Sequence, residues 1–233
     1  NDIWLNEGFA RYCQALWVEN IDGKQAYFNF MNDHAYYGGG TIYVENPSSN
    51  SQIFNSSLSY NKASWVLHML RHKVGDEMFF EILKEYASND SLAYNAASTA
   101  DFQKVCEDIS GTDFEQFFQQ WIYGDRYPKY ELSWWSEEND VYKVKIDQIQ
   151  SYGIFSMPID LNFSGSIGTL SVDTTIVVEN NTNSHLYEIS GLDFFVENVT
   201  IDPNNWILKE ATYVTNGIEN IVAKQINVDI AYP

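Results

Sequence analysis

The sequence has 233 residues, long enough for one large domain or two ordinary ones. Hydrophobic residues make up 45% of it and aromatic residues 16%, a globular composition that excludes a disordered chain. The 32 acidic residues outweigh the 13 basic ones, and the net charge of −19 argues against nucleic acid or an anionic membrane as a partner. No apolar run approaches the roughly 18 to 20 residues that a membrane-spanning helix needs.

Apolar residues recur at helical spacing before Gly124, and this pattern predicts six helices. The first begins near Asn6, and its apolar stripe consists of Phe9, Cys13, Leu16 and Trp17. The expected starts of the others, by capping residues and spacing, are Asp22, Ser57, Asp76, Ser98 and Thr112. Residues 36–56 form a long loop rich in Gly, Ser and Asn, and loops of this length are usually functional or mobile.

From Tyr130 onward apolar and polar residues alternate, as in Tyr142, Val144 and Ile146. Further strands are expected around 157–163, 168–178, 184–190, 195–202 and 206–213. About seven short strands in roughly 85 residues are typical of an Ig-like β-sandwich. We therefore expect an α+β multidomain chain, with a helical domain over 1–125, an all-β sandwich over 126–213 and a tail or linker over 214–233.

The two cysteines, Cys13 and Cys106, both fall on helical patterns. Two cysteines form neither a disulfide framework nor a cysteine-based zinc site. The two cysteines could form a disulfide bond with each other or remain two separate buried thiols, and we favour the buried thiols.

A carboxylate follows an apolar Trp-Leu pair at the start of the first predicted helix. The helix macrodipole could simply stabilise the Glu7 carboxylate there, a role that needs no metal. Its surroundings, Asp2-Ile3-Trp4-Leu5-Asn6-Glu7-Gly8-Phe9-Ala10, nevertheless resemble the second half of the zinc site of M1 metallopeptidases. In that family H-E-x-x-H is followed by a Glu inside a W-L-N-E-G-F-A segment. The resemblance implies that Glu7 is the third protein ligand of a tetrahedral zinc whose fourth position holds water.

The stretch Tyr60-Asn61-Lys62-Ala63-Ser64-Trp65 is similar to the Y-x-K-G-A helix of the same family. There the Tyr hydroxyl donates to the oxyanion as water attacks the peptide carbonyl, so the resemblance implies a catalytic role for Tyr60. Such a role needs a neutral donor at pH 7 on a rigid element. Ala63 departs from the usual Gly, and without the first match Tyr60 would read as one more core aromatic residue. A third stretch, from Asp101 to Pro128, resembles the helix pair that leads into the family's β-sandwich.

Two histidines, His68 and His72, stand four residues apart on a helix, the spacing that zinc proteases use. Met69 follows the first of them, so the general base of H-E-x-x-H is absent, and we expect a structural role for both rings. His34 and His185 are expected to be isolated and superficial.

The resemblance implies a thermolysin-like catalytic domain of a zinc-dependent aminopeptidase that removes N-terminal residues from peptides. The 233 residues contain no H-E-x-x-H and no G-A-M-E-N-type strand. We therefore expect a fragment that carries Glu7 and Tyr60, binds zinc weakly and is inactive alone, whereas its parent binds Zn²⁺. The alternative is a non-catalytic M1-like scaffold whose sandwich binds a sugar or a protein. An exposed Trp134-Trp135 pair would suit sugar stacking, but we favour a packing cluster at the domain junction for these two residues.

The last residues, Ile226 to Pro233, resemble the opening of C-terminal sorting domains on secreted bacterial proteins. This similarity predicts an extracellular or cell-envelope location. Loss of an upstream half would leave an apolar helical face uncovered, which predicts self-association of the fragment.

Overall fold

The computed structural model describes residues 1–214, apart from the side chain of Asn139, and divides into two units. The first unit contains residues 1–127 together with two later segments, 155–159 and 204–209. The second contains 128–154, 160–203 and, among the described residues, 210–214. Most of the predicted tail, and the Ile226–Pro233 string behind the predicted location, lie outside the described residues. No helix in the described part is long and apolar enough to cross a membrane.

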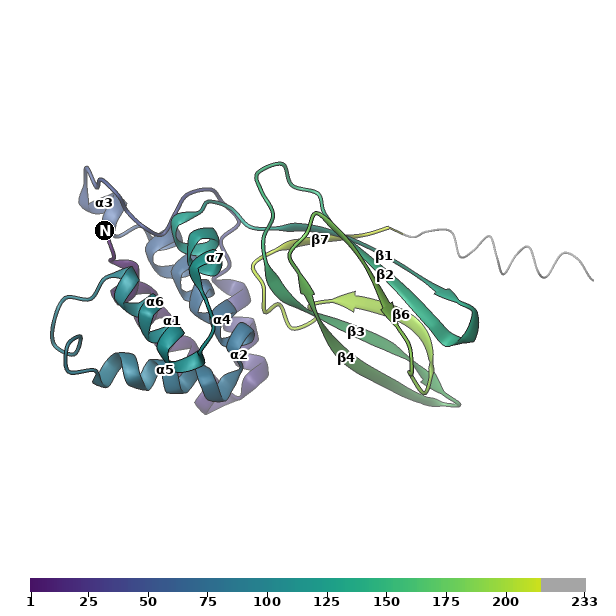
Figure 1. Cartoon of the computed structure of the whole chain (residues 1–233). Coiled ribbons are helices and arrows are strands. Elements are labelled where there is room, and N and C mark those ends of the chain that lie inside the picture. The colour runs from purple at the N-terminus through teal and green to yellow at the C-terminus, as the bar shows by residue number, and fades with distance from the viewer. Residues whose placement is uncertain (215–233) are drawn as a thin grey trace, which may run out of the picture. The chain divides into compact units, whose positions relative to one another are not determined.

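The first unit is helical (Figure 1). Its helices are α1 (Trp4–Asp22), α2 (Lys24–Asp33), α3 (Asn50–Ile53), α4 (Ala63–Val74), α5 (Asp76–Ser88), α6 (Thr99–Ser110) and α7 (Glu115–Phe118). Two π-helical turns accompany them, η1 (Ser56–Lys62) before α4 and η2 (Gln119–Tyr123) after α7. The helix expected from Ser57 therefore consists of a π turn followed by an α-helix, and π turns often occur at functional sites.

The helix starts follow the sequence only in part. The capping box of Ser98 and Asp101 forms as predicted at the start of α6. The N-caps of α2 and α5 are Gly23 and Gly75, each of which also closes the preceding helix with a positive φ. The predictions of Asp22 and Asp76 as caps were therefore wrong. The predicted second capping box is also absent, because α7 begins after Phe114.

The buried face of α1 differs from the predicted stripe. Its buried residues are Trp4, Leu5, Gly8, Tyr12 and Ala15. Trp17 is 68% exposed and Cys13 is exposed as well. Apolar residues surround this helix, so spacing alone did not identify the face that packs on α2, α4 and η1. Both thiols are free, and only Cys106 is buried, so the prediction of two buried thiols was wrong for Cys13.

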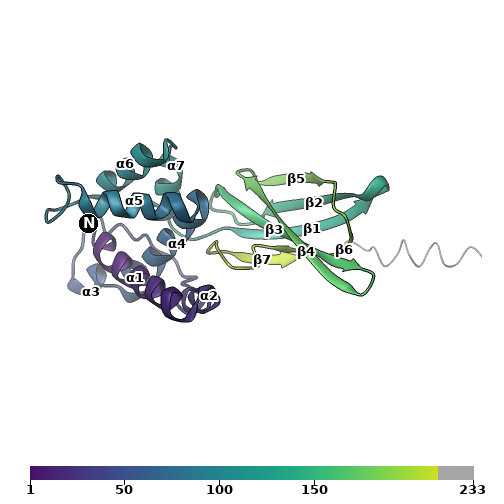
Figure 2. The same cartoon turned by 90° about the horizontal axis from the view of Figure 1, so that it is seen from below.

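The second unit contains two sheets. Their strands are β1 (Lys129–Glu137), β2 (Val141–Gln148), β3 (Met157–Ile167), β4 (Leu170–Asn180), β5 (Ser184–Ile189), β6 (Phe195–Ile201) and β7 (Glu210–Tyr213). One sheet has the order β5-β2-β1-β7 and the other β4-β3-β6, as Figure 2 shows. β1 pairs antiparallel with β2 and parallel with β7. The predicted alternation is clear in β2, whose Tyr142, Val144 and Ile146 are buried. The chain is thus α+β as expected.

The segment 204–209 explains why the last predicted strand is shorter than expected. Trp206 packs in the helical unit, where its ring stacks on His68 and His72 at centroid distances of 4.7 and 5.2 Å. The next two residues, Ile207 and Leu208, are also buried. The strand expected over 206–213 therefore begins only at Glu210.

Candidate active site

The two residues singled out by the sequence lie on neighbouring elements of the helical unit. Glu7 is in the first turn of α1 and is half-buried. Tyr60 is in η1 and is also half-buried. Because α1 packs directly against η1, folding brings two stretches together that are more than fifty residues apart in the sequence.

A close helix approach beside Glu7 fixes this arrangement. A Cβ atom added to Gly8 would lie 2.5 Å from the Cβ of Ala63, a distance that no real contact allows. Gly8 therefore lets α1 approach the start of α4, immediately after the turn that carries Tyr60. The departure from the motif at Ala63 is accommodated because its methyl group fills the space that the missing Gly8 side chain leaves.

The environment of Tyr60 keeps its hydroxyl protonated. Its pKa is raised above the ordinary tyrosine value, first by desolvation and then by the carboxylate of Glu7. That carboxylate favours the neutral phenol and would repel a phenolate. Arg11 acts in the opposite direction, as the smallest cause. At pH 7 Tyr60 is therefore a neutral hydrogen-bond donor.

Arg11, a further neighbour of this pair, was not predicted from the sequence. It follows Glu7 by four residues on α1, the spacing that places two side chains on one helix face, and that spacing could have identified it. Its Nη1 donates to Gln14 Oε1 at 3.1 Å and lies 3.2 Å from His34 Nε2. Since His34 Nδ1 donates to the Phe30 carbonyl at 2.7 Å, the neutral ring accepts the guanidinium N–H at Nε2. His34 is thus half-buried and bonded, and the expectation of an isolated, superficial ring was wrong.

The described residues do not form a zinc site by themselves. Among residues 1–214 no group of three or more His, Cys, Asp or Glu side chains is arranged to hold a metal ion. A tetrahedral zinc site needs three protein ligands even when its fourth position is open to water. Glu7 could supply one ligand, and residues 1–214 do not complete a set of three.

The His68–His72 pair has the structural role that we expected. His68 is fully buried, with Nδ1 2.5 Å from the Tyr27 hydroxyl and Nε2 3.0 Å from the Asn205 carbonyl oxygen. The His72 Nε2 lies 3.2 Å from the Pro158 carbonyl oxygen. Both rings therefore bind the backbone of the later segments of the helical unit, and Trp206 stacks on both.

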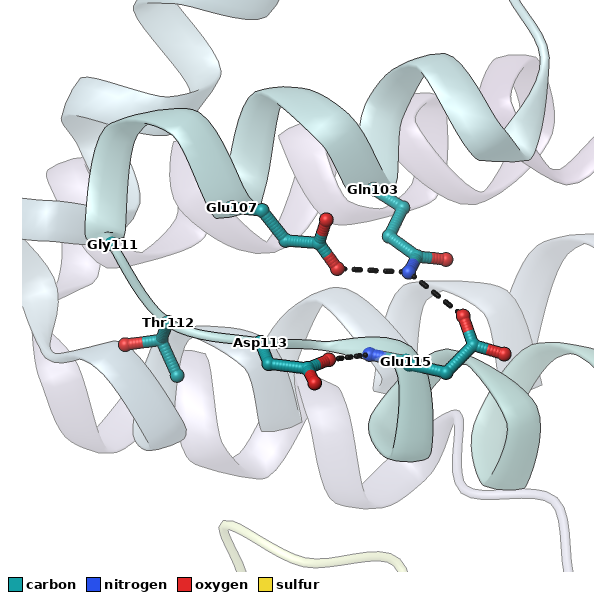
Figure 3. Close-up of a pocket in the computed structure, with 6 residues that line it drawn as sticks. All are labelled: Gln103, Glu107, Gly111, Thr112, Asp113 and Glu115. Atoms are coloured by element: carbon teal, nitrogen blue, oxygen red, sulfur yellow. Dashed lines mark hydrogen bonds between the residues drawn. The ribbon is translucent and has the colours of Figure 1, made fainter.

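A hollow of about 450 Å³ lies at the turn between α6 and α7 (Figure 3). Its carboxylates have structural partners. Glu107 accepts from Gln103 Nε2 at 2.8 Å and from the Phe114 backbone N–H at 3.2 Å. Asp113 accepts from the Glu115 backbone N–H at 2.8 Å. These bonds end α6 and begin α7, so the hollow is a helix junction and no catalytic centre.

Trp134 and Trp135 are half-buried and are not the exposed pair that sugar stacking would require. Trp134 and Trp135 are consecutive residues of β1, and consecutive side chains of a strand point to opposite faces. The two rings therefore do not form one stacking platform. His185 is exposed on β5, as expected.

Comparison with known proteins agrees with the position of these motifs. The peptidase family M1 domain matches residues 1–121, just over half of the chain. Aminopeptidase N of Lactococcus lactis subsp. lactis is 29% identical over 140 residues, which are 55% of this chain and 16% of that protein. Tricorn protease-interacting factor F2 of Thermoplasma volcanium is 26% identical over 214 residues, 81% of this chain and 26% of that protein. The chain thus spans between about a sixth and a quarter of these relatives.

A solved structure shows the same fold. The crystal structure of Legionella pneumophila aminopeptidase A in complex with aspartic acid superposes with a TM-score of 0.77 at 12% identity. The superposition covers 91% of this chain and 24% of that one. With the match of the domain over the whole α1–α7 region, these findings show that the chain belongs to peptidase family M1.

Proposed function

We propose that these residues are part of a zinc-dependent aminopeptidase that hydrolyses N-terminal residues from peptides. The observation that carries the proposal is the packing of α1 against η1, which places Glu7 and Tyr60 on neighbouring elements, each within a stretch that resembles the site of the family. Relatives named aminopeptidase support peptides as the substrate class.

In this proposal Glu7 supplies one carboxylate ligand to the metal. The two imidazole ligands and the general base would come from residues outside these 233, which contain no H-E-x-x-H. On its own the chain should therefore bind zinc weakly and hydrolyse no peptide.

Tyr60 would stabilise the oxyanion that develops when water attacks the peptide carbonyl. A neutral phenol can donate a hydrogen bond to this charge, and the raised pKa of Tyr60 retains the required proton. The Glu7 carboxylate contributes to that raised pKa, so it helps to keep the phenol neutral before substrate binds.

Two further parts of the proposal concern the rest of the chain. We assign the two sheets to an Ig-like sandwich, on the basis of their four-plus-three strand arrangement. We also infer self-association through exposed apolar side chains on α1, of which Trp17 is 68% and Ile21 58% exposed. A monomer at all concentrations in sedimentation would contradict the second inference.

The test uses a longer chain that contains these residues together with an H-E-x-x-H segment. Tyr60→Phe should lower kcat by about 10²- to 10³-fold, the loss typical of one oxyanion donor, and leave the zinc content unchanged. Tyr86→Phe, which removes another half-buried hydroxyl of the same unit, is the control and should retain full activity. Full activity of Tyr60→Phe would contradict the assignment. A wild-type longer chain without peptidase activity would favour the non-catalytic scaffold.

A further inference from the structure

A lysine is buried in the same π turn as Tyr60. Lys62 is 1% exposed, and its Nζ donates to the Gly40 carbonyl oxygen at 2.8 Å. Burial lowers the pKa of Lys62 to about 8, and the charge of Asp125 opposes this shift. A buried ammonium group is costly unless its hydrogen bonds and charge are matched, so the position of this side chain is closely defined.

The acceptor of Lys62 lies in the glycine-rich loop that the sequence marks as unusual. The backbone N–H of Gly40 donates to Asp125 Oδ1 at 2.5 Å, so both backbone polar groups of this residue have side-chain partners. Those partners come from η1 and from the end of the helical stretch. Gly40 is therefore held between two segments that are far apart in the sequence.

Only glycine suits this position. Gly40 has a φ of +111°, which side chains rarely adopt, and an added Cβ would lie 2.8 Å from Leu58 Cδ1. Leu58 belongs to η1, as Lys62 does. The loop thus packs against the π turn through a close backbone approach and is bonded to the same turn by Lys62.

Tyr60 and Lys62 are two residues apart in a helical turn, and side chains at this spacing do not face each other. The Glu7 carboxylate on α1 contributes to the raised pKa of Tyr60, whereas Lys62 donates to the loop. The hydrogen bond from Lys62 to the loop therefore restrains rotation of η1, the turn that carries the Tyr60 hydroxyl.

We propose that Lys62 is a positioning residue, which together with Asp125 holds the Gly38–Gly40 loop against η1 and so orients Tyr60 towards Glu7. This proposal depends on the proposed function only in assuming that catalysis uses Tyr60. The orientation itself can be measured in the 233-residue chain without a metal and without activity.

The experiment follows the Tyr60 resonance in chain labelled with ¹³Cζ-tyrosine at pH 7, assigned by its loss in Tyr60→Phe. Glu7→Gln removes the carboxylate charge that contributes to the raised pKa of Tyr60 and gives the reference shift. Lys62→Met should move the resonance in the same direction, whereas Lys62→Arg, which can still donate to the loop carbonyl, should restore it. The Tyr130 resonance, from the second unit, should stay in place throughout.

A folded Lys62→Met variant with an unmoved Tyr60 resonance would overturn the proposal. If that variant does not fold, Asp125→Ala decides in its place, since Asp125 is 45% exposed and its loss disturbs the core less. A moved Tyr60 resonance in Asp125→Ala supports the proposal, and an unmoved one overturns it. If Glu7→Gln leaves the resonance unmoved, Glu7 and Tyr60 do not interact and the proposed function fails, a result distinct from a failure at Lys62 alone.

Discussion

The two units of this protein treat charge in different ways. The helical unit buries the cationic side chains Lys62 and Arg71, which are 1% and 2% exposed. In the described part of the second unit, the lysines Lys129, Lys143 and Lys145 remain partly exposed and pair with carboxylates at the surface. The second unit does bury carboxylates and amides, among them Asp202 and Asn180, whereas the buried cations Lys62 and Arg71 belong to the helical unit.

This difference coincides with the position of the candidate site. The family match covers residues 1–121, which contain Glu7, Tyr60 and every helix of the first unit. A buried charge needs partners at defined positions, so each such contact fixes the geometry of the elements around it. The comparison therefore predicts that loss of a buried cation in the helical unit costs more stability than loss of a partly exposed lysine in the sheets.

The largest expected loss of stability follows the substitution of Arg71. Its guanidinium bonds both oxygens of Glu19, at 2.6 and 3.0 Å, and both of Asp76, at 2.8 and 2.9 Å. Arg71→Ala should lower the free energy of unfolding by about 3 kcal/mol, because breaking a buried ion pair leaves uncompensated charge. Urea denaturation measures this loss. Lys143→Ala, which breaks the surface pair with Glu188 in the sheets, should cost less than about 1 kcal/mol. Equal costs at the two sites would refute the difference between the units.

The same cluster gives a dependence on pH. Hydrogen bonding from Arg71 lowers the pKa of Asp76 below its ordinary value. Its contribution to stability is therefore present above the unfolded-state pKa and is lost as the pH falls through the folded-state pKa. Asp76 is half-exposed, so the effect is modest. Acid titrations of stability should show a smaller loss in Arg71→Ala than in the wild type.

A smaller loss of stability is expected from a substitution where α1 approaches α4. Gly8→Ala should lower the free energy of unfolding by about 1 to 3 kcal/mol through overpacking against Ala63, although alanine favours helices more than glycine. The double variant Gly8→Ala/Ala63→Gly removes the clash. A double-mutant cycle in urea should give a coupling free energy above about 1 kcal/mol, and additive costs would show that the close approach is absent.

The sequence was informative where structure is local. The Ser98 capping box and the alternation in β2 depend on neighbouring residues, and both form as predicted. The buried face of α1 was missed, because apolar residues occur around the helix and only its neighbours decide which side is covered. A strand was expected over 206–213, but Trp206 instead stacks on the His68 ring of the helical unit.

The sequence was also limited in what it could predict of the candidate active site. Motif resemblance identified Glu7 and Tyr60 but could not show that they lie on neighbouring elements. Arg11 could have been inferred from its helical spacing to Glu7. The bond from Lys62 to Gly40 could not, because it joins residues whose proximity only the folded chain creates.

The most direct test of the central claim is the zinc content of a longer chain that includes H-E-x-x-H, measured after dialysis by mass spectrometry of the metal. Glu7→Ala should reduce bound zinc to well below one ion per chain. Glu77→Ala, which removes another first-turn helix carboxylate, should leave the zinc content at that of the wild type. Retention of one zinc ion per chain by Glu7→Ala would show that Glu7 only favours the start of its helix and is no metal ligand.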